Sequence, residues 1–212
     1  RGDVPVARRF DDPYFSLNGG LEETRHVFLA GNKLPERFVP GFHIAELGFG
    51  TGLNALTALL AWQSAGTTGQ LRFTSFERYL LEPRDVARAL SAYPELNKLA
   101  APLLDARGKG QTKIETEHLQ LEIIEGDARA TLPDWTGKAD AWFLDGFSPA
   151  KNPELWEPTL MAEVAHHTEP QGTAATYSAA GNVRRSLADA GFEVERRPGF
   201  GRKRHMTVAR LA

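Results

Sequence analysis

Three glycines recur at every second position in the stretch Glu-Leu-Gly-Phe-Gly-Thr-Gly-Leu-Asn, residues 46–54. The residues before it are typical of a buried strand, and the apolar run at 53–62 predicts a helix. Glycine permits positive φ and lets backbone N–H groups approach a ligand where a Cβ would clash, while a helix N-terminus adds partial positive charge. This stretch therefore predicts a nucleotide-cofactor loop between a strand and a helix.

The glycine spacing distinguishes between cofactor classes. A dinucleotide fingerprint requires G-x-G-x-x-G, whereas this loop reads Glu-x-Gly-x-Gly-x-Gly, the form typical of Rossmann-like methyltransferases that use S-adenosylmethionine. A tight turn that binds nothing is the alternative. The cofactor contacts that we expect from the loop are Glu46, Gly48, Gly50, Thr51, Gly52 and Asn54.

Acidic residues follow or end three further predicted strands, at Glu77, Asp127 and Asp145. Ligands of open α/β sheets lie at the carboxyl ends of the strands, so we expect these acids beside the glycine loop. Glu77 suits the ribose, because one carboxylate accepts from both hydroxyls. Asp127 suits the adenine amino group and Asp145 the transferred methyl. The neighbours Arg78 and Ala128 complete the expected cofactor contacts.

Two of these acids also have ordinary structural interpretations. Asp127 can cap the N-terminus of the short turn that follows it, and this role is compatible with cofactor binding. Asp145 precedes Gly146 and can simply form a turn. These alternatives stay open at the level of the sequence.

The predicted elements that position these residues alternate between strand and helix. We expect strands at 43–47, 71–77, 139–145, 172–178 and 192–197, two extended runs that could pair within 112–125, and a last strand at 204–211 that closes the sheet. The pattern predicts an α/β, Rossmann-like class I methyltransferase fold with a mostly parallel seven-stranded sheet and a C-terminal antiparallel hairpin. Residues 1–40 are expected to form an N-terminal β-hairpin extension, extended also over 24–29, and 41–212 the methyltransferase domain.

Composition narrows the chemistry. The chain of 212 residues is 42% hydrophobic and 25% charged, which suits one globular domain, and it has no apolar run of the ~20 residues that a membrane span needs. We expect a cytoplasmic protein with no membrane partner. Because there is no cysteine, radical S-adenosylmethionine catalysis and pyrimidine carbon methylation through a cysteine adduct are excluded. The methyl acceptor should therefore be a nucleophile itself.

The chain resembles a known family, the methyltransferase half of the bifunctional tRNA 5-methylaminomethyl-2-thiouridine biosynthesis enzymes (MnmC). The most specific match is Leu-Asp-Gly-Phe-Ser-Pro-Ala-Lys-Asn-Pro at 144–153. The full set of matching runs is residues 11–16, 20–24, 46–54, 75–77, 142–153 and 199–203.

This resemblance implies methyl transfer from S-adenosylmethionine to the aminomethyl nitrogen of 5-aminomethyl-(2-thio)uridine at the tRNA wobble position, with S-adenosylhomocysteine as product. Asp145 is then the candidate catalytic residue, which accepts or orients the proton of the amine. Tyr14 is expected over the cofactor or in a turn. The flavin oxidoreductase half of bifunctional members is absent from this chain, so we expect no FAD, no metal, and a separate flavin enzyme as a possible partner.

The net charge of −2 predicts that any tRNA site is a local basic patch. Phe147, Phe200 and Trp156 can stack a flipped uridine or belong to the core. The expected substrate contacts are Phe147, Lys151, Arg184, Arg185, Phe200, Arg202, Lys203 and Arg204. Alternatives are methylation of another amine, in a small molecule or a protein, and a non-catalytic cofactor- or RNA-binding module.

Overall fold

The computed structural model describes residues 6–7, 12–13 and 19–212. Its main sheet has eight strands in the described part of the chain. Their spatial order is β5 (Lys113–Glu115), β6 (Leu119–Glu125), β4 (Leu71–Glu77), β3 (His43–Leu47), β7 (Ala139–Leu144), β8 (Thr168–Thr176), β10 (His205–Leu211) and β9 (Phe192–Pro198).

The mostly parallel sheet and its antiparallel C-terminal hairpin are confirmed. Strands β6, β4, β3, β7 and β8 run parallel, while β5, β10 and β9 pair antiparallel with their neighbours. Two details of the prediction are wrong. The sheet has eight strands rather than seven, although the two runs expected within 112–125 do pair, as β5 and β6. In addition, β10 does not close the sheet, because it inserts between β8 and β9.

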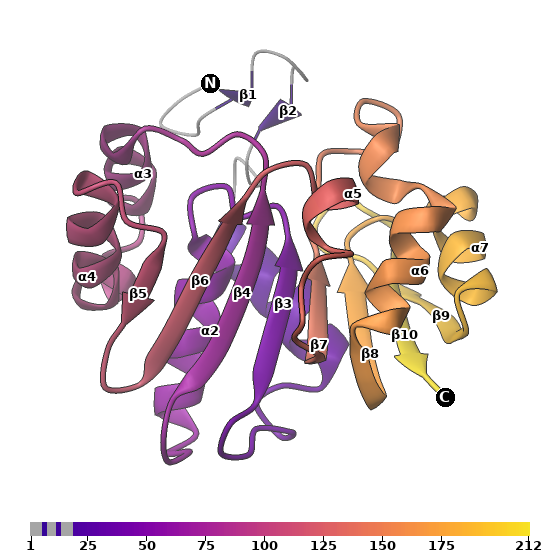
Figure 1. Cartoon of the computed structure of the whole chain (residues 1–212), viewed down its shortest axis with the longest axis horizontal. Helices are drawn as coiled ribbons and strands as arrows, with labels where there is room; N and C mark the ends of the chain where they lie inside the picture. Colours follow the sequence, from indigo (N-terminus) through magenta and orange to yellow (C-terminus); the bar gives the residue numbers. More distant parts are fainter. Residues whose placement is uncertain (1–5, 8–11, 14–18) are drawn as a thin grey trace.

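Helices cover both faces of the sheet. Figure 1 shows α2 behind the sheet and α5 and α6 in front of it. One face of the sheet shares its apolar core with α2 (Leu53–Ser64), α3 (Pro83–Leu90) and α4 (Asn97–Gly108). The other face shares its core with α5 (Ala128–Thr131), α6 (Pro158–His166) and α7 (Gly181–Asp189). Short 3₁₀ turns lie at Pro94–Leu96 and Pro153–Trp156.

The two cores follow from the strand sequences. Ile44 of β3 packs into one core and its neighbour Ala45 into the other, and Phe143 and Trp142 of β7 divide in the same way. Side chains of a strand point alternately to opposite faces, so a strand covered on both sides is buried at every position and mostly apolar. All five residues of β3 are buried, including its single acid, Glu46.

The first part of the chain differs from the prediction. Val6–Ala7 (β1) and Asp12–Pro13 (β2) do pair antiparallel. However, the expected extended structure at 24–29 is wrong, because residues 20–32 are helical: α1 (Gly20–Glu23), the π-helix η1 (Thr24–Leu29) and the 3₁₀ turn η2 (Ala30–Asn32). The domain boundary at residue 40 stays a prediction.

The helical segment is held by the sheet. Leu21 and Phe28 are buried in the core, and the spacing 21, 24, 28 places these side chains with Thr24 on one helical face. At its end, buried Asn32 donates to the carbonyls of Phe28 and Trp142 at 2.9 and 3.3 Å. Tertiary packing thus outweighs the turn signal of Gly19 and Gly20, and Gly19 instead starts the helix with φ of 80°.

Across the part of the chain that the structure describes, no helix combines the length and apolar character needed to cross a membrane.

Candidate active site

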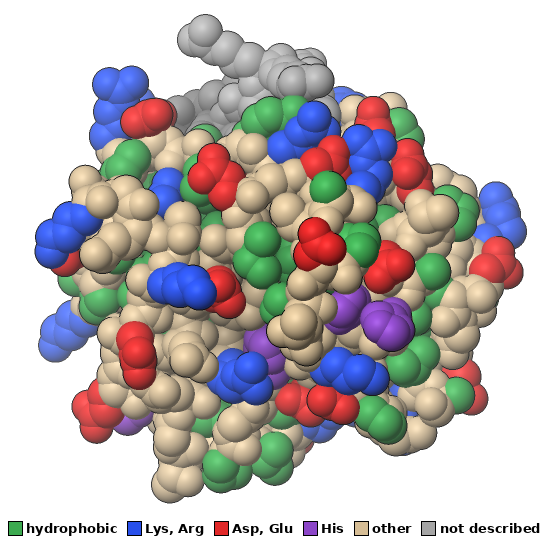
Figure 2. Space-filling model, in the orientation of Figure 1, with side chains coloured by type: hydrophobic (Ala, Val, Ile, Leu, Met, Phe, Trp, Pro, Cys, Tyr) green, Lys and Arg blue, Asp and Glu red, His purple; other side chains and the backbone are tan. Residues whose placement is uncertain are grey.

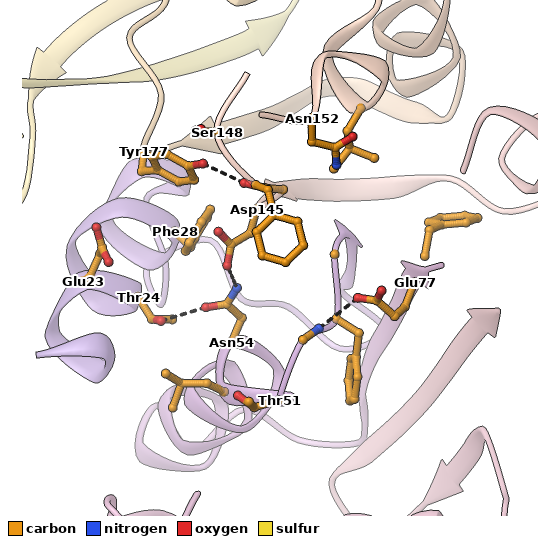
Figure 3. Close-up of a pocket in the computed structure, with 18 of the residues that line it drawn as sticks. Glu23, Thr24, Phe28, Thr51, Asn54, Glu77, Asp145, Ser148, Asn152 and Tyr177 are labelled. Atoms are coloured by element: carbon orange, nitrogen blue, oxygen red, sulfur yellow. Dashed lines mark hydrogen bonds between the residues drawn. The ribbon is translucent and has the colours of Figure 1, made fainter. Parts of the chain in front are cut away.

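A cavity of about 730 Å³ opens at the carboxyl edge of the sheet (Figure 3). Its walls include residues that follow β3, β6, β7 and β8, together with Glu77 at the end of β4. Strands β3 and β7 are adjacent, and the next strand of the main sheet after each lies on opposite sides, β4 beside β3 and β8 beside β7. The cavity therefore lies at the topological switch point, where open α/β sheets bind ligands. The volume lies within the range of ligand pockets.

The glycine loop forms one wall of the cavity. Gly48 has φ of 92°, and a Cβ there would collide with the backbone carbonyl of Asp145. Gly48, Gly50 and Thr51 line the cavity, whereas Gly52 does not. Gly52 instead precedes α2 with φ of 79°, where a Cβ would meet the Phe49 ring at 2.8 Å. Gly52 is therefore needed for the turn rather than for contact with the cavity.

Glu77 ties the glycine loop to the end of β4. Its Oε2 accepts the backbone N–H of Gly50 at 3.1 Å, and its Oε1 accepts that of Tyr79 at 2.7 Å. Burial raises the pKa of Glu77, and these backbone hydrogen bonds oppose the rise. Glu77 also lines the cavity.

Asp127 caps α5, since its Oδ1 accepts the Arg129 backbone N–H at 3.1 Å. Its carboxylate also pairs with the guanidinium groups of Arg129 and Arg78 at 2.7 and 2.8 Å. Hydrogen bonds from Arg129 lower the pKa of Asp127 to about 2. The capping role is therefore present, and Asp127, Arg78 and Ala128 also line the cavity.

Asn54, in the first turn of α2, joins two buried carboxyl groups. Its Nδ2 donates to Asp145 Oδ2 at 2.7 Å and to Glu46 Oε1 at 2.9 Å (Figure 3 shows the first of these). Its Oδ1 accepts from the Thr24 hydroxyl at 2.7 Å, which fixes the orientation of the amide. Ser75 donates to the other oxygen of Glu46, also at 2.7 Å.

Both carboxyl groups hold protons unusually tightly. Burial raises the pKa of Glu46 to about 8, and burial raises that of Asp145 to about 7. Hydrogen bonds from Asn54 oppose both shifts. Glu46 has no exposed surface and does not line the cavity. The structure therefore places Glu46 behind Asn54, where it orients the amide, rather than in direct contact with a cofactor.

The remaining predicted substrate residues divide into two groups. Phe147, Phe200, Arg202 and Lys203 line the cavity. Lys151, Arg184, Arg185 and Arg204 do not line it. Trp156 is buried in the core and donates its Nε1–H to the Phe147 carbonyl at 2.9 Å, so of its two predicted roles the structure supports the core. Tyr14 lies outside the described residues.

Several cavity residues escaped the sequence predictions, among them Glu23, Thr24 and Tyr177. Lys203 Nζ lies 2.7 Å from Glu23 Oε1 and 4.0 Å from the centroid of the Tyr177 ring. The Tyr177 hydroxyl donates to the Gly146 carbonyl at 2.7 Å. Tyr177 follows β8 and so obeys the strand-end rule that located the acids, whereas Glu23 and Thr24 reach the cavity only because residues 20–32 are helical.

Metal ligands do not cluster in the part of the chain that the structure describes, which holds no group of three or more His, Asp or Glu side chains suited to an ion.

A family model described as S-adenosyl-L-methionine-dependent methyltransferase matches residues 94–212, more than half of the chain. The chain belongs to this family. The predicted fold class, methyltransferase activity and cofactor are thereby confirmed.

Relatives of this methyltransferase carry a common name, tRNA 5-methylaminomethyl-2-thiouridine biosynthesis bifunctional protein MnmC. The protein of that name from Pseudomonas paraeruginosa is 45% identical over 95% of this chain, and the one from Chromobacterium violaceum is 44% identical over 98%. The chain spans about a third of the length of these relatives, 33% in both cases. The predicted resemblance to the MnmC methyltransferase portion is confirmed.

Solved structures agree with this assignment. The crystal structure of MNMC2 from Aquifex aeolicus matches with a TM-score of 0.79 and 32% identity, over 97% of this chain and 66% of that one. A precorrin-6y C5,15-methyltransferase from Geobacter metallireducens matches with a TM-score of 0.54 at 13% identity, over 99% of this chain and 95% of that one. The second likeness concerns the fold alone.

The buried proton on Glu46 predicts a pH dependence of stability. The folded protein retains this proton up to a pKa of about 8, while the unfolded chain releases it near the ordinary glutamate value. The folded state then binds more protons between these values, so the free energy of unfolding falls as pH rises through that window. Glu46→Gln removes this titration and keeps an acceptor for Asn54. We expect the variant to lose less stability than the wild type between about pH 5.5 and 8, measured by denaturant unfolding.

The control for this prediction is Glu125→Gln, because Glu125 is an exposed glutamate at the end of β6. It should retain the wild-type pH slope. Parallel profiles for wild type and Glu46→Gln would contradict a protonated Glu46 in the folded state.

Proposed function

We propose that the protein methylates the aminomethyl nitrogen of 5-aminomethyl-(2-thio)uridine at the tRNA wobble position, giving 5-methylaminomethyl-(2-thio)uridine and S-adenosylhomocysteine. The observation that carries this proposal is the Asp145 carboxyl group, held by Asn54 in the cavity with a pKa of about 7. A base that titrates near neutral pH is matched to removing a proton from an amine. The names of the relatives support the choice of nucleoside.

The cavity residues fit the cofactor. Glu77, Asp127 and Ala128 line the cavity, and we assign Glu77 to the ribose hydroxyls and Asp127 to the adenine amino group. The absent Cβ of Gly48 lets the backbone of Asp145 approach the glycine loop, so the loop and Asp145 line the same cavity. When bound, S-adenosylmethionine supplies a methyl group on a positively charged sulfonium. Asp145, Glu77 and Asp127 favour this cation electrostatically.

Asp145 has two tasks in the proposed reaction. An alkyl amine has a pKa of about 10 and is mostly protonated at neutral pH, so its lone pair is not available. The ionised Asp145 takes one proton, the nitrogen then forms the new N–C bond, and the S–C bond breaks with its electron pair left on sulfur. Asp145 and its neighbours also align nitrogen with methyl, and such alignment contributes ~7 to 11 kcal/mol in favourable cases.

The tRNA is proposed to contact the rim of the cavity. Arg202 and Arg204 are exposed on the loop between β9 and β10, and Lys151, Arg184 and Arg185 follow β7 and β8. On the face drawn in Figure 2, acidic and basic side chains are interspersed, which makes that face a poor phosphate-binding surface. We assign base stacking to Phe147 and Phe200, both cavity-lining aromatics.

The aminomethyl group has to be made before it can be methylated. The relatives are named bifunctional and are about three times as long as the matched region, which is 33% of their length. We propose that a flavin oxidoreductase unit supplies the free amine to this site.

Glu77→Gln tests the cofactor assignment. The substitution removes the charge and one acceptor that we assign to the ribose hydroxyls, and charged hydrogen bonds contribute about 1.5–3 kcal/mol. The dissociation constant for S-adenosylmethionine should rise about tenfold to hundredfold, measured by calorimetry. Glu125→Gln is the matched control, since Glu125 pairs with Glu77 in the sheet but does not line the cavity. Unchanged affinity in Glu77→Gln would remove Glu77 from the cofactor site.

Asp145→Asn tests the proposed base. Below a pKa of about 7 the wild-type carboxyl group is protonated and cannot accept a proton, so kcat/KM should fall as pH drops below about 7. The variant should lose most turnover but keep S-adenosylmethionine affinity within about tenfold of wild type. Its residual kcat/KM should not show the fall below about pH 7. Asp134→Asn, at an exposed position, should behave as wild type. Wild-type turnover in Asp145→Asn would refute the assignment.

The substrate assignment is tested directly with tRNA that carries 5-aminomethyl-2-thiouridine. After incubation with the protein and S-adenosylmethionine, nucleoside digestion and mass spectrometry should detect 5-methylaminomethyl-2-thiouridine, and Asp145→Asn should give little or none. Absence of this nucleoside with wild-type protein that binds the cofactor would sink the proposal.

A further inference from the structure

An ammonium group already lies in the part of the cavity opposite Glu77. Lys203 Nζ is 2.7 Å from Glu23 Oε1 and 4.0 Å from the centroid of the Tyr177 ring. A carboxylate beside an aromatic face is the combination that recognises alkylammonium ions, through a charge-assisted hydrogen bond and a cation–π contact. Figure 3 shows Glu23, Tyr177 and Asp145 around the same hollow.

The two groups that hold this ammonium are anchored in the fold. Glu23 belongs to α1, and its side chain is only 12% exposed. Tyr177 is fixed by its hydroxyl, which donates to the carbonyl of Gly146, the residue after Asp145. The aromatic face is therefore held next to the proposed base.

The cation itself is less restrained. Lys203 lies on the loop between β9 and β10, and its side chain is 42% exposed. Its four-carbon stem can swing toward solvent, whereas the stems of Glu23 and Tyr177 are packed. The site is thus a fixed acceptor that holds an exchangeable cation. The charges of both Glu23 and Lys203 also act on the pKa of Asp145, in opposite directions, which places this pair within electrostatic range of the base.

We propose that Glu23 and Tyr177 form the binding site for the ammonium form of the substrate, and that Lys203 occupies this site until the substrate displaces it. The identity of the amine rests on the proposed function, but the cation site itself does not. The entering ammonium takes the place of Lys203 Nζ and passes one proton to Asp145. The displaced Lys203 turns outward beside Arg202, where both cations can pair with tRNA phosphates.

This arrangement sets the substrate class. The site favours a primary alkylammonium on a planar ring, because the CH₂–NH₃⁺ group reaches the carboxylate while the ring lies among Phe147 and Phe200. An uncharged hydroxymethyl group of the same shape gains neither the ion pair nor the cation–π contact. A substrate held by Asp145 alone would leave the Lys203–Glu23 pair intact. Substitutions of Glu23, Tyr177 and Lys203 distinguish this case from a substrate that displaces Lys203.

Benzylammonium chloride and benzyl alcohol are the probes, and their binding is measured by NMR titration of protein saturated with S-adenosylhomocysteine at about pH 8, where Asp145 is ionised. We expect wild-type protein to bind benzylammonium at least about tenfold tighter than benzyl alcohol. Glu23→Gln and Tyr177→Leu should abolish this preference, while Tyr177→Phe retains the ring and should keep it. Lys203→Met should strengthen benzylammonium binding, because the internal competitor is gone.

A matched control is available at Lys109, whose ion pair with Asp105 has the same 2.7 Å separation but is solvent-exposed and lies outside the cavity. Lys109→Met should bind both probes as wild type does. Equal wild-type affinity for the two probes, preference retained in Glu23→Gln, or weakened benzylammonium binding in Lys203→Met would each overturn the inference. If the preference depends on Glu23 but aminomethyl tRNA is not methylated, the cation site stands and the proposed tRNA substrate falls.

Discussion

Two buried carboxyl groups share a single amide, and the site depends on this arrangement. Asn54 Nδ2 has two N–H groups, and it directs one to Asp145 and the other to Glu46. Burying two carboxylates together is costly, so protons are retained, with pKa values of about 7 and about 8. At neutral pH Glu46 keeps its proton while Asp145 titrates. The pair therefore provides one ionisable base at the cavity rather than two competing charges.

Several elements of the fold exist to hold this amide in place. Thr24 fixes the Asn54 carbonyl from the helical segment 20–32, and Ser75 satisfies the far side of Glu46 from β4. Gly48 must lack a side chain, because the backbone carbonyl of Asp145 occupies the space of its Cβ. One strand order, in which β3 lies between β4 and β7, brings all these groups together. The chemistry is local, but its support comes from four separate segments.

The sequence predicted the residues at strand ends well and the segments between them less well. The acids Glu77, Asp127 and Asp145 line the cavity as expected, and so do the expected loop residues except Glu46 and Gly52. This success has a simple reason, since parallel strands read from sequence must place their carboxyl ends at one edge. Residues 24–29 were expected to be extended, because the glycine turns on either side dominate the local signal. Packing of Leu21 and Phe28 against the sheet made them helical instead.

By itself, the sequence determined the fold class, the cofactor class and three of the acids that line the cavity, because these follow from periodicity and from residue types at strand ends. Only the tertiary structure decided the roles of side chains that meet from distant segments. It moved Glu46 behind Asn54, inserted β10 between β8 and β9, and paired Lys203 with Glu23 across 180 residues of sequence. Contacts of this kind depend on how separate elements pack, and no local pattern encodes them.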